Sequence, residues 1–214
     1  MTRQTLILPL SIALMLAGCG RQTPMLPTDA LDQAAACGVV AAATERETAG
    51  AKGELPADAQ ARILHFAMLY ASTGKALDQD KVNAVSKRMP GLFDQTVRGD
   101  WHALRPACGA AFPASQIKQP VLPVRPLDAM LQCDALAEFL RKALADQGST
   151  YGEAANAYGT FIEKLDPKMS MALRAAGLRG ADALRAKKLE AVAAAAKLGQ
   201  PPAVMAACEK AYAT

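Results

Sequence analysis

The chain has 214 residues, of which 51% are hydrophobic and 21% charged, and 24 basic against 20 acidic residues give a formal net charge of +4. So small a positive excess does not predict nucleic-acid binding, and we expect no nucleic-acid partner. The length allows one large domain or two small ones. Plentiful alanine, with one tryptophan, four tyrosines and five phenylalanines, favours helices around a modest core.

The first 18 residues have the pattern of an export signal. Arg3 precedes an apolar run from Leu6 to Ala17, and the small residue Gly18 follows. The run is 12 residues long, whereas a membrane-spanning helix needs about 20. The sequence therefore predicts a cleaved signal peptide over residues 1–18 rather than a transmembrane anchor.

The four residues Leu16-Ala17-Gly18-Cys19 resemble the lipobox of bacterial lipoproteins. The resemblance implies cleavage before Cys19, a diacylglyceryl group on its sulfur and acylation of the new amine. Such an anchor is effectively permanent, because each buried methylene adds about 0.8 kcal/mol of membrane affinity. Gly20, where retained inner-membrane lipoproteins carry aspartate, favours the outer membrane. The implied protein is lipid-anchored in the cell envelope and faces the periplasm; an ordinary secretory signal with a chance cysteine is the alternative.

Residues 19–28 are predicted to be a short tether. The stretch from Thr23 to Thr28 reads TPMLPT, and its two prolines favour an extended chain.

With Cys19 lipidated, four cysteines remain, and an even number in an oxidising compartment predicts two disulfides with three possible connectivities. Cys37 and Cys133 follow the same Leu-Asp pair, in LDQAAAC and LDAMLQC. Cys108 and Cys208 each have glycine nine residues before and an aromatic residue four after. These flanks predict a duplicated unit with the bonds Cys37–Cys108 and Cys133–Cys208, each joining the first and last helix of a unit. Chance similarity between alanine-rich helices is the alternative.

The first unit is predicted over residues 29–112. A helix spans about 29–49, and a second begins at Pro56 and ends before Gly74. Asp78 caps a third helix, which we expect to stop at Met89-Pro90-Gly91, with a short helix to Arg98 and a last one around Cys108.

Prolines at 113, 120, 123 and 126 predict an extended linker over residues 113–126 that excludes a helix. The second unit, residues 127–214, repeats the plan, with Asp166-Pro167 expected to start its third helix. Because no stretch alternates as a strand does, the predicted fold is all-α, with two tandem helical units of about four to five helices each.

Residues suited to catalysis are few. His65 is predicted to be a helix-face or core residue, and Trp101 to anchor the core beside His102. No catalytic or nucleotide-binding motif occurs, and with two isolated histidines and no close cysteine pair we expect no metal or other cofactor. Basic residues exceed acidic ones between 168 and 197, but the four in the predicted long helix, Arg185, Lys187, Lys188 and Lys197, do not share one stripe. A solvated surface is therefore favoured over a lipid-binding patch.

The expected function is therefore non-enzymatic: binding of another envelope protein or polymer, with no catalytic residue. An immunity-type inhibitor of a toxic periplasmic enzyme is one alternative. A helical enzyme acting on peptidoglycan or lipid is another, because scattered carboxylates can meet as an acid–base pair only in the tertiary structure.

The lipobox resemblance predicts the outcome of a single substitution. Cys19→Ser removes the sulfur that would carry the diacylglyceryl group, so the protein should leave the membrane fraction. Fractionation with a high-salt wash, compared with the unaltered chain, measures this, and a variant that stays membrane-bound contradicts the resemblance.

Overall fold

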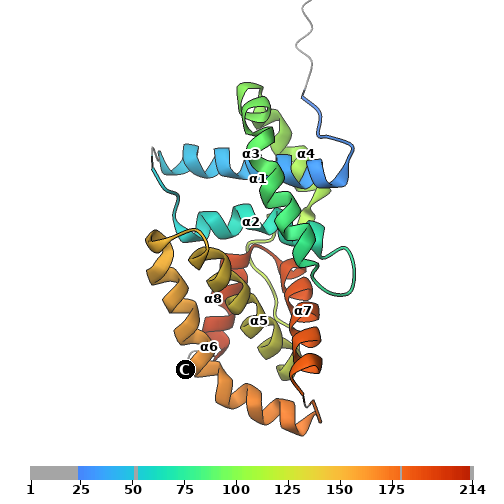
Figure 1. Ribbon diagram of the computed structural model, residues 1–214, viewed down its shortest axis with the longest axis vertical. Coiled ribbons are helices and arrows are strands. Elements are labelled where there is room, and N and C mark those ends of the chain that lie inside the picture. Colours follow the sequence, from blue (N-terminus) through green and yellow to red (C-terminus); the bar gives the residue numbers. More distant parts are fainter. Residues whose placement is uncertain (1–23, 51–52, 179, 213–214) are drawn as a thin grey trace, which may run out of the picture.

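The computed structural model describes residues 24–50, 53–178 and 180–212, and all regular secondary structure within them is helical (Figure 1). The α-helices are α1 (Ala30–Ala49), α2 (Ala57–Ala71), α3 (Gln79–Arg98), α4 (Arg105–Ala111), α5 (Pro126–Ala145), α6 (Gly152–Ala175), α7 (Ala181–Leu198) and α8 (Pro201–Tyr212). Three short 3-10 helices are η1 (Trp101–Leu104), η2 (Pro113–Gln116) and η3 (Ser149–Tyr151). The all-α prediction is confirmed.

Two disulfides close the two halves of the chain, α1–α4 and α5–α8. Cys37 in α1 bonds to Cys108 in α4, and Cys133 in α5 bonds to Cys208 in α8, with Cα–Cα distances of 5.5 and 5.6 Å. Both predicted pairings, and the link between first and last helix, are confirmed. The bonds span 71 and 75 residues, for which the chain-entropy model gives about 4 to 5 kcal/mol each.

The halves share a packing plan. In the first half α1 packs against α2 and α3, and in the second α5 packs against α6 and α7. The paired glycines seen in the sequence, Gly99 and Gly199, follow the last residues of α3 and α7. The two aromatic residues that follow the last cysteine of each half are Phe112 and Tyr212. The ring of Phe112 contacts that of Phe66 edge to face, with 5.5 Å between the ring centroids, and Tyr212 packs on the main core. The shared sequence signals therefore lie at matching places in the two halves.

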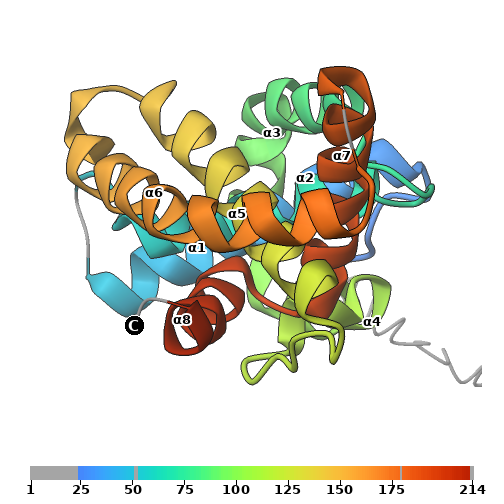
Figure 2. The ribbon, with the colours of Figure 1, turned by 90° about the horizontal axis from the view of Figure 1, so that it is seen from below.

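One core runs through both halves. Its largest cluster includes Met68 and Val85 from the first half and Leu136, Leu165 and Val204 from the second. Helix α2 lies at the junction, between the layer of α1 and α3 and the layer of α5, α7 and α8 (Figures 1 and 2). The unit boundary at residues 113–126 stays a prediction, and the units it would separate share this core.

Two prolines do not act as the sequence predicted. Pro90 lies within α3 instead of ending it, and Pro167 lies within α6 instead of starting a new helix. A proline inside a helix costs about 3 kcal/mol because it removes a hydrogen bond. Buried residues on both sides of each proline hold the helix in place: Val85 and Leu92 in α3, Leu165 and Met169 in α6. Figure 1 shows α6 bending partway along its length.

The proline-rich segment also differs from its prediction. Residues Pro113–Gln116 form the 3-10 helix η2, and Pro126 opens α5, because the fixed φ of proline suits a first helical turn. The carbonyl of Ile117 accepts a hydrogen bond from the Gln200 backbone N–H at 3.0 Å. A Cβ on Gly199 would lie 2.7 Å from that carbonyl oxygen. The segment thus packs against the α7–α8 junction, where only glycine fits.

The halves differ at the position that follows the first cysteine of each. In the first half this is Gly38, where a Cβ would lie 3.0 Å from Met89 of α3. In the second half it is Asp134, which is fully buried and lies 2.8 Å from the Nζ of Lys188 in α7. Lys188 also lies 2.7 Å from Glu138. Burial raises the pKa of Asp134, and the neighbouring ammonium group of Lys188 acts against that rise.

Removing Lys188 should destabilise the fold because Asp134 would be left buried without its partner. Breaking a fully buried pair costs about 3–5 kcal/mol; Lys188→Met should cost less, since the Lys188 side chain is 27% exposed. Urea unfolding measures the change, and the double variant Asp134→Leu/Lys188→Met should recover stability.

Lys142→Met is the matched control. Lys142 pairs with the same Glu138 at 3.0 Å but is 63% exposed, so its removal should change stability by no more than about 0.5 kcal/mol. Equal effects of Lys188→Met and Lys142→Met would contradict a structural role for the buried pair.

Candidate functional site

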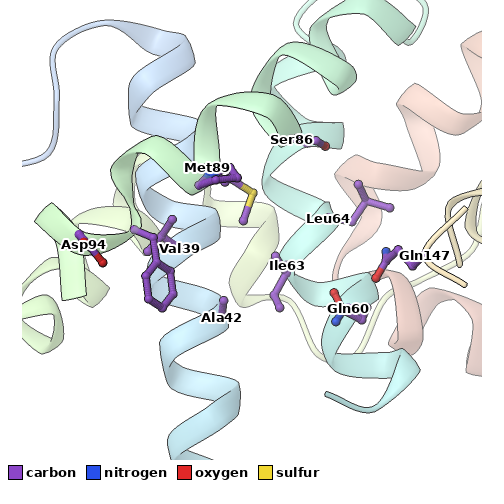
Figure 3. Close-up of a pocket in the computed structure, with 12 residues that line it drawn as sticks. Val39, Ala42, Gln60, Ile63, Leu64, Ser86, Met89, Asp94 and Gln147 are labelled. Atoms are coloured by element: carbon purple, nitrogen blue, oxygen red, sulfur yellow. The ribbon is translucent and has the colours of Figure 1, made fainter. Parts of the chain in front are cut away.

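A cavity of about 630 Å³ opens between α1, α2 and α3 (Figure 3). We call it the α1–α3 cleft. Its apolar lining comes from all three helices: Val39, Ala42, Ile63, Leu64, Ala67, Met89, Pro90 and Phe93. Volume and lining fall within the range of small-ligand and peptide sites in proteins.

Phe93 gives the cleft an exposed aromatic edge. Its side chain is 40% exposed, and it is the aromatic member of the exposed large hydrophobic residues in the described part of the chain. Met89, beside it on α3, has a flexible thioether that adapts to different contact shapes. The apolar surface of the cleft is therefore accessible from solvent.

Polar side chains stand at the two ends of the cleft. Asp94 lies at one end, and Gln60 and Gln147 lie at the other (Figure 3). Gln60 donates to the Tyr151 hydroxyl at 2.9 Å, and that hydroxyl donates to the Leu55 carbonyl at 2.9 Å. Because Gln147 and Tyr151 belong to the second half, the contact between halves positions this end of the cleft.

Pro90 removes one hydrogen-bond donor from the backbone of α3. Proline has no N–H, so the Ser86 carbonyl one turn earlier lacks the usual helical donor. Ser86 and Pro90 both line the cleft, and the Ser86 hydroxyl donates to the Val82 carbonyl at 3.1 Å. The sequence analysis placed the end of the helix at Pro90 and so did not predict a proline inside α3. The apolar residues Leu92 and Phe93, which follow Pro90, were the signal that the helix continues.

The two histidines lie apart on different elements. His65 in α2 is 1% exposed, as a core residue would be, and its Nε2 lies 2.7 Å from the Ala196 carbonyl in α7. Burial lowers the pKa of His65 to about 4. His102 stacks on Trp101 at 3.8 Å between ring centroids, and Trp101 packs against the cluster around Cys37 and Cys108. The predicted core placement of His65 is confirmed, whereas Trp101 is only partly buried, at the edge of this smaller cluster.

The basic residues of α7 are partly neutralised. Lys187 lies 2.7 Å from Glu190, and Lys188 is held by Asp134 and Glu138. That the remaining basic residues form a solvated surface rather than a lipid-binding patch stays a prediction.

Cys19, the predicted lipidation site, lies outside the described residues, as does the whole signal peptide. Of the helices that the structure does describe, none combines the length and hydropathy of a membrane span. Across the same residues, no three histidine, cysteine, aspartate or glutamate side chains gather as a metal site would require.

Comparison of the chain with protein-family models, with curated proteins and with solved structures finds no match. Function is therefore inferred from the residues and geometry of the chain itself.

The buried His65 predicts a pH dependence of stability. Its folded pKa of about 4 lies below the ordinary histidine pKa of 6.5, so the unfolded state takes up the proton first as the pH falls. The stability contributed by neutral His65 is complete above about pH 6.5 and is lost toward pH 4, by about 3 kcal/mol in all.

His65→Gln keeps a donor toward Ala196 and does not titrate, so its unfolding free energy should fall less over this range. Denaturant unfolding at several pH values measures both curves, with the exposed His102→Gln as control; equal slopes for His65→Gln and the unaltered chain would contradict the assignment.

Proposed function

We propose that this chain is a lipid-anchored, periplasm-facing envelope protein that binds another protein in the α1–α3 cleft and catalyses no reaction. The observation that carries the proposal is the cleft itself, a preformed apolar cavity of about 630 Å³ with the exposed Phe93 at its edge. Exposed apolar surface gathered in one hollow is typical of an interaction site rather than of solvated surface.

The disulfides support the proposed compartment. Cys37–Cys108 and Cys133–Cys208 are bonds of the kind that persist in oxidising compartments, such as the bacterial periplasm. The same compartment is implied by the resemblance of residues 16–19 to a lipobox. The bonds also favour a rigid cleft, since α1, which forms one wall, is tied to α4.

The polar groups of the cleft favour a peptide segment over an acyl chain. The side chains of Asp94, Gln60 and Gln147 offer hydrogen bonds at the two ends of the cleft. A peptide brings N–H donors and polar side chains to meet them, whereas an acyl chain would leave them unpaired. An amphipathic helix, whose apolar residues recur every three or four positions, suits a groove between helices.

Site-specific crosslinking in cells tests the proposal. A photoreactive phenylalanine analogue at position 93 should capture one protein in defined stoichiometry, identified by mass spectrometry. The same analogue at Met171 of α6, which is 60% exposed and does not line the cleft, is the control. Capture of the same proteins from both positions, or of none from position 93, contradicts the proposal.

Once the partner is purified, Phe93→Lys should weaken its binding. Burying a phenylalanine contributes about 1.5–3 kcal/mol, which corresponds to roughly a tenfold to hundredfold change in Kd. Met171→Lys introduces the same charge at a more exposed site outside the cleft, so it should leave the Kd within about twofold and, like Phe93→Lys, should change stability little. Calorimetry measures both, and equal Kd values for the two variants would argue against the cleft. If the partner is an enzyme that loses activity on binding, the proposal narrows to an immunity-type inhibitor.

A further inference from the structure

A second cavity, of about 540 Å³, lies beside the Cys37–Cys108 disulfide. It uses other faces of α1 and α2 than the α1–α3 cleft does, and it is completed by α4, η2 and the residues that follow η2. We call it the disulfide cavity. Unlike the cleft, it is lined by several charged side chains, so the two sites would take different ligands.

The charges of the disulfide cavity are mostly positive. Arg62, Arg105 and Lys118 line it, against the single carboxylate of Glu45. Glu45 accepts from Nε and Nη2 of Arg62 at 2.6 and 2.8 Å, which leaves the Nη1 edge of that guanidinium with free N–H donors. Arg105 and Lys118 form no ion pair with any carboxylate in the described part of the chain. These side chains supply donors and charge for an anion.

One lining residue of the cavity, His65, carries a buried acceptor. The Nε2 of His65 bonds to the Ala196 carbonyl, so Nε2 carries the hydrogen and Nδ1 is the acceptor. His65 is 1% exposed, and its Nδ1 has no hydrogen-bond partner among the described residues. An unpaired buried acceptor is unfavourable, and a ligand that donates to it would remove that cost.

We propose that the disulfide cavity binds a small anion, a carboxylate or a phosphate, that also carries a hydroxyl or N–H donor. The anionic group contacts Arg105, Lys118 and the free edge of Arg62, and the donor reaches toward His65. Charge-assisted hydrogen bonds from guanidinium and ammonium groups are the usual means of holding carboxylates and phosphates. The proposal is independent of the α1–α3 cleft, and each can fail without the other.

Four probes separate charge from hydrogen bonding. Glucuronate carries a carboxylate and hydroxyls, glucose 6-phosphate carries a phosphate and hydroxyls, glucose carries hydroxyls alone, and sulfate carries charge alone. In calorimetry and amide NMR titrations at low salt, one of the first two should bind at least about tenfold more tightly than glucose or sulfate, and which one binds identifies the anionic group. The shifted amides should cluster at Arg105, Gln116 and Lys118. No saturable binding of either sugar anion, or binding no tighter than that of sulfate, overturns the proposal.

Matched variants test the residues. Arg105→Gln/Lys118→Gln should weaken binding of the sugar anion by about tenfold. Arg174→Gln/Arg185→Gln removes the same charge from exposed sites that do not line the cavity, and binding should stay within about twofold. If both double variants lost the same amount of binding, the attraction would be unspecific, and this result would overturn the proposal. His65→Leu removes the acceptor together with the donor toward Ala196, so it should weaken binding of the sugar anion but not of sulfate; should this variant unfold, the sulfate comparison on the unaltered chain still tests the donor.

Discussion

Burial of α2 between the two halves is the packing constraint on which the other features depend. One face of this helix meets α1 and α3, and others meet α5, α7 and α8. Ile63 and Leu64 on it line the α1–α3 cleft, while Arg62 and His65 line the disulfide cavity. The hydrogen bond from His65 to Ala196 fixes α2 against α7. A helix with neighbours on most sides has little freedom to rotate, so both cavities keep their linings together.

Alanine and glycine make this close arrangement possible, and the disulfides stabilise it. Small side chains let helices approach each other, as at Gly38, where a Cβ would lie 3.0 Å from Met89. Small side chains also bury less apolar area per residue, so the core contributes less free energy. Each half is closed by a bond between its first and last helix, which restricts the unfolded chain and offsets part of that deficit.

The two halves share a packing plan but differ in one contact near the proposed cleft. The place of the Gly38–Met89 contact in the first half is taken in the second by the buried Asp134–Lys188 pair. In the first half this contact is apolar, and Met89 and Phe93 of α3 line the cleft. In the second half the corresponding helix, α7, uses Lys188 to neutralise Asp134. Both proposed sites therefore lie mainly in the first half, and the second half supplies support and the Gln147 end of the cleft.

The sequence alone determined the helical class, the disulfide pairing and most helix boundaries, because composition, repeated flanks and capping residues act locally or leave a visible pattern along the chain. It did not predict that helices continue through Pro90 and Pro167. A proline weakens a helix by a local and known amount, whereas the burial of Val85, Leu92, Leu165 and Met169 that outweighs it exists only once the halves pack. Neither cavity was visible in the sequence, since each joins side chains from separate helices whose rotation is set by the contacts of α2. The sequence pattern thus determined where the helices form. The tertiary structure determined which of their side chains line the same cavity, because that depends on non-local packing.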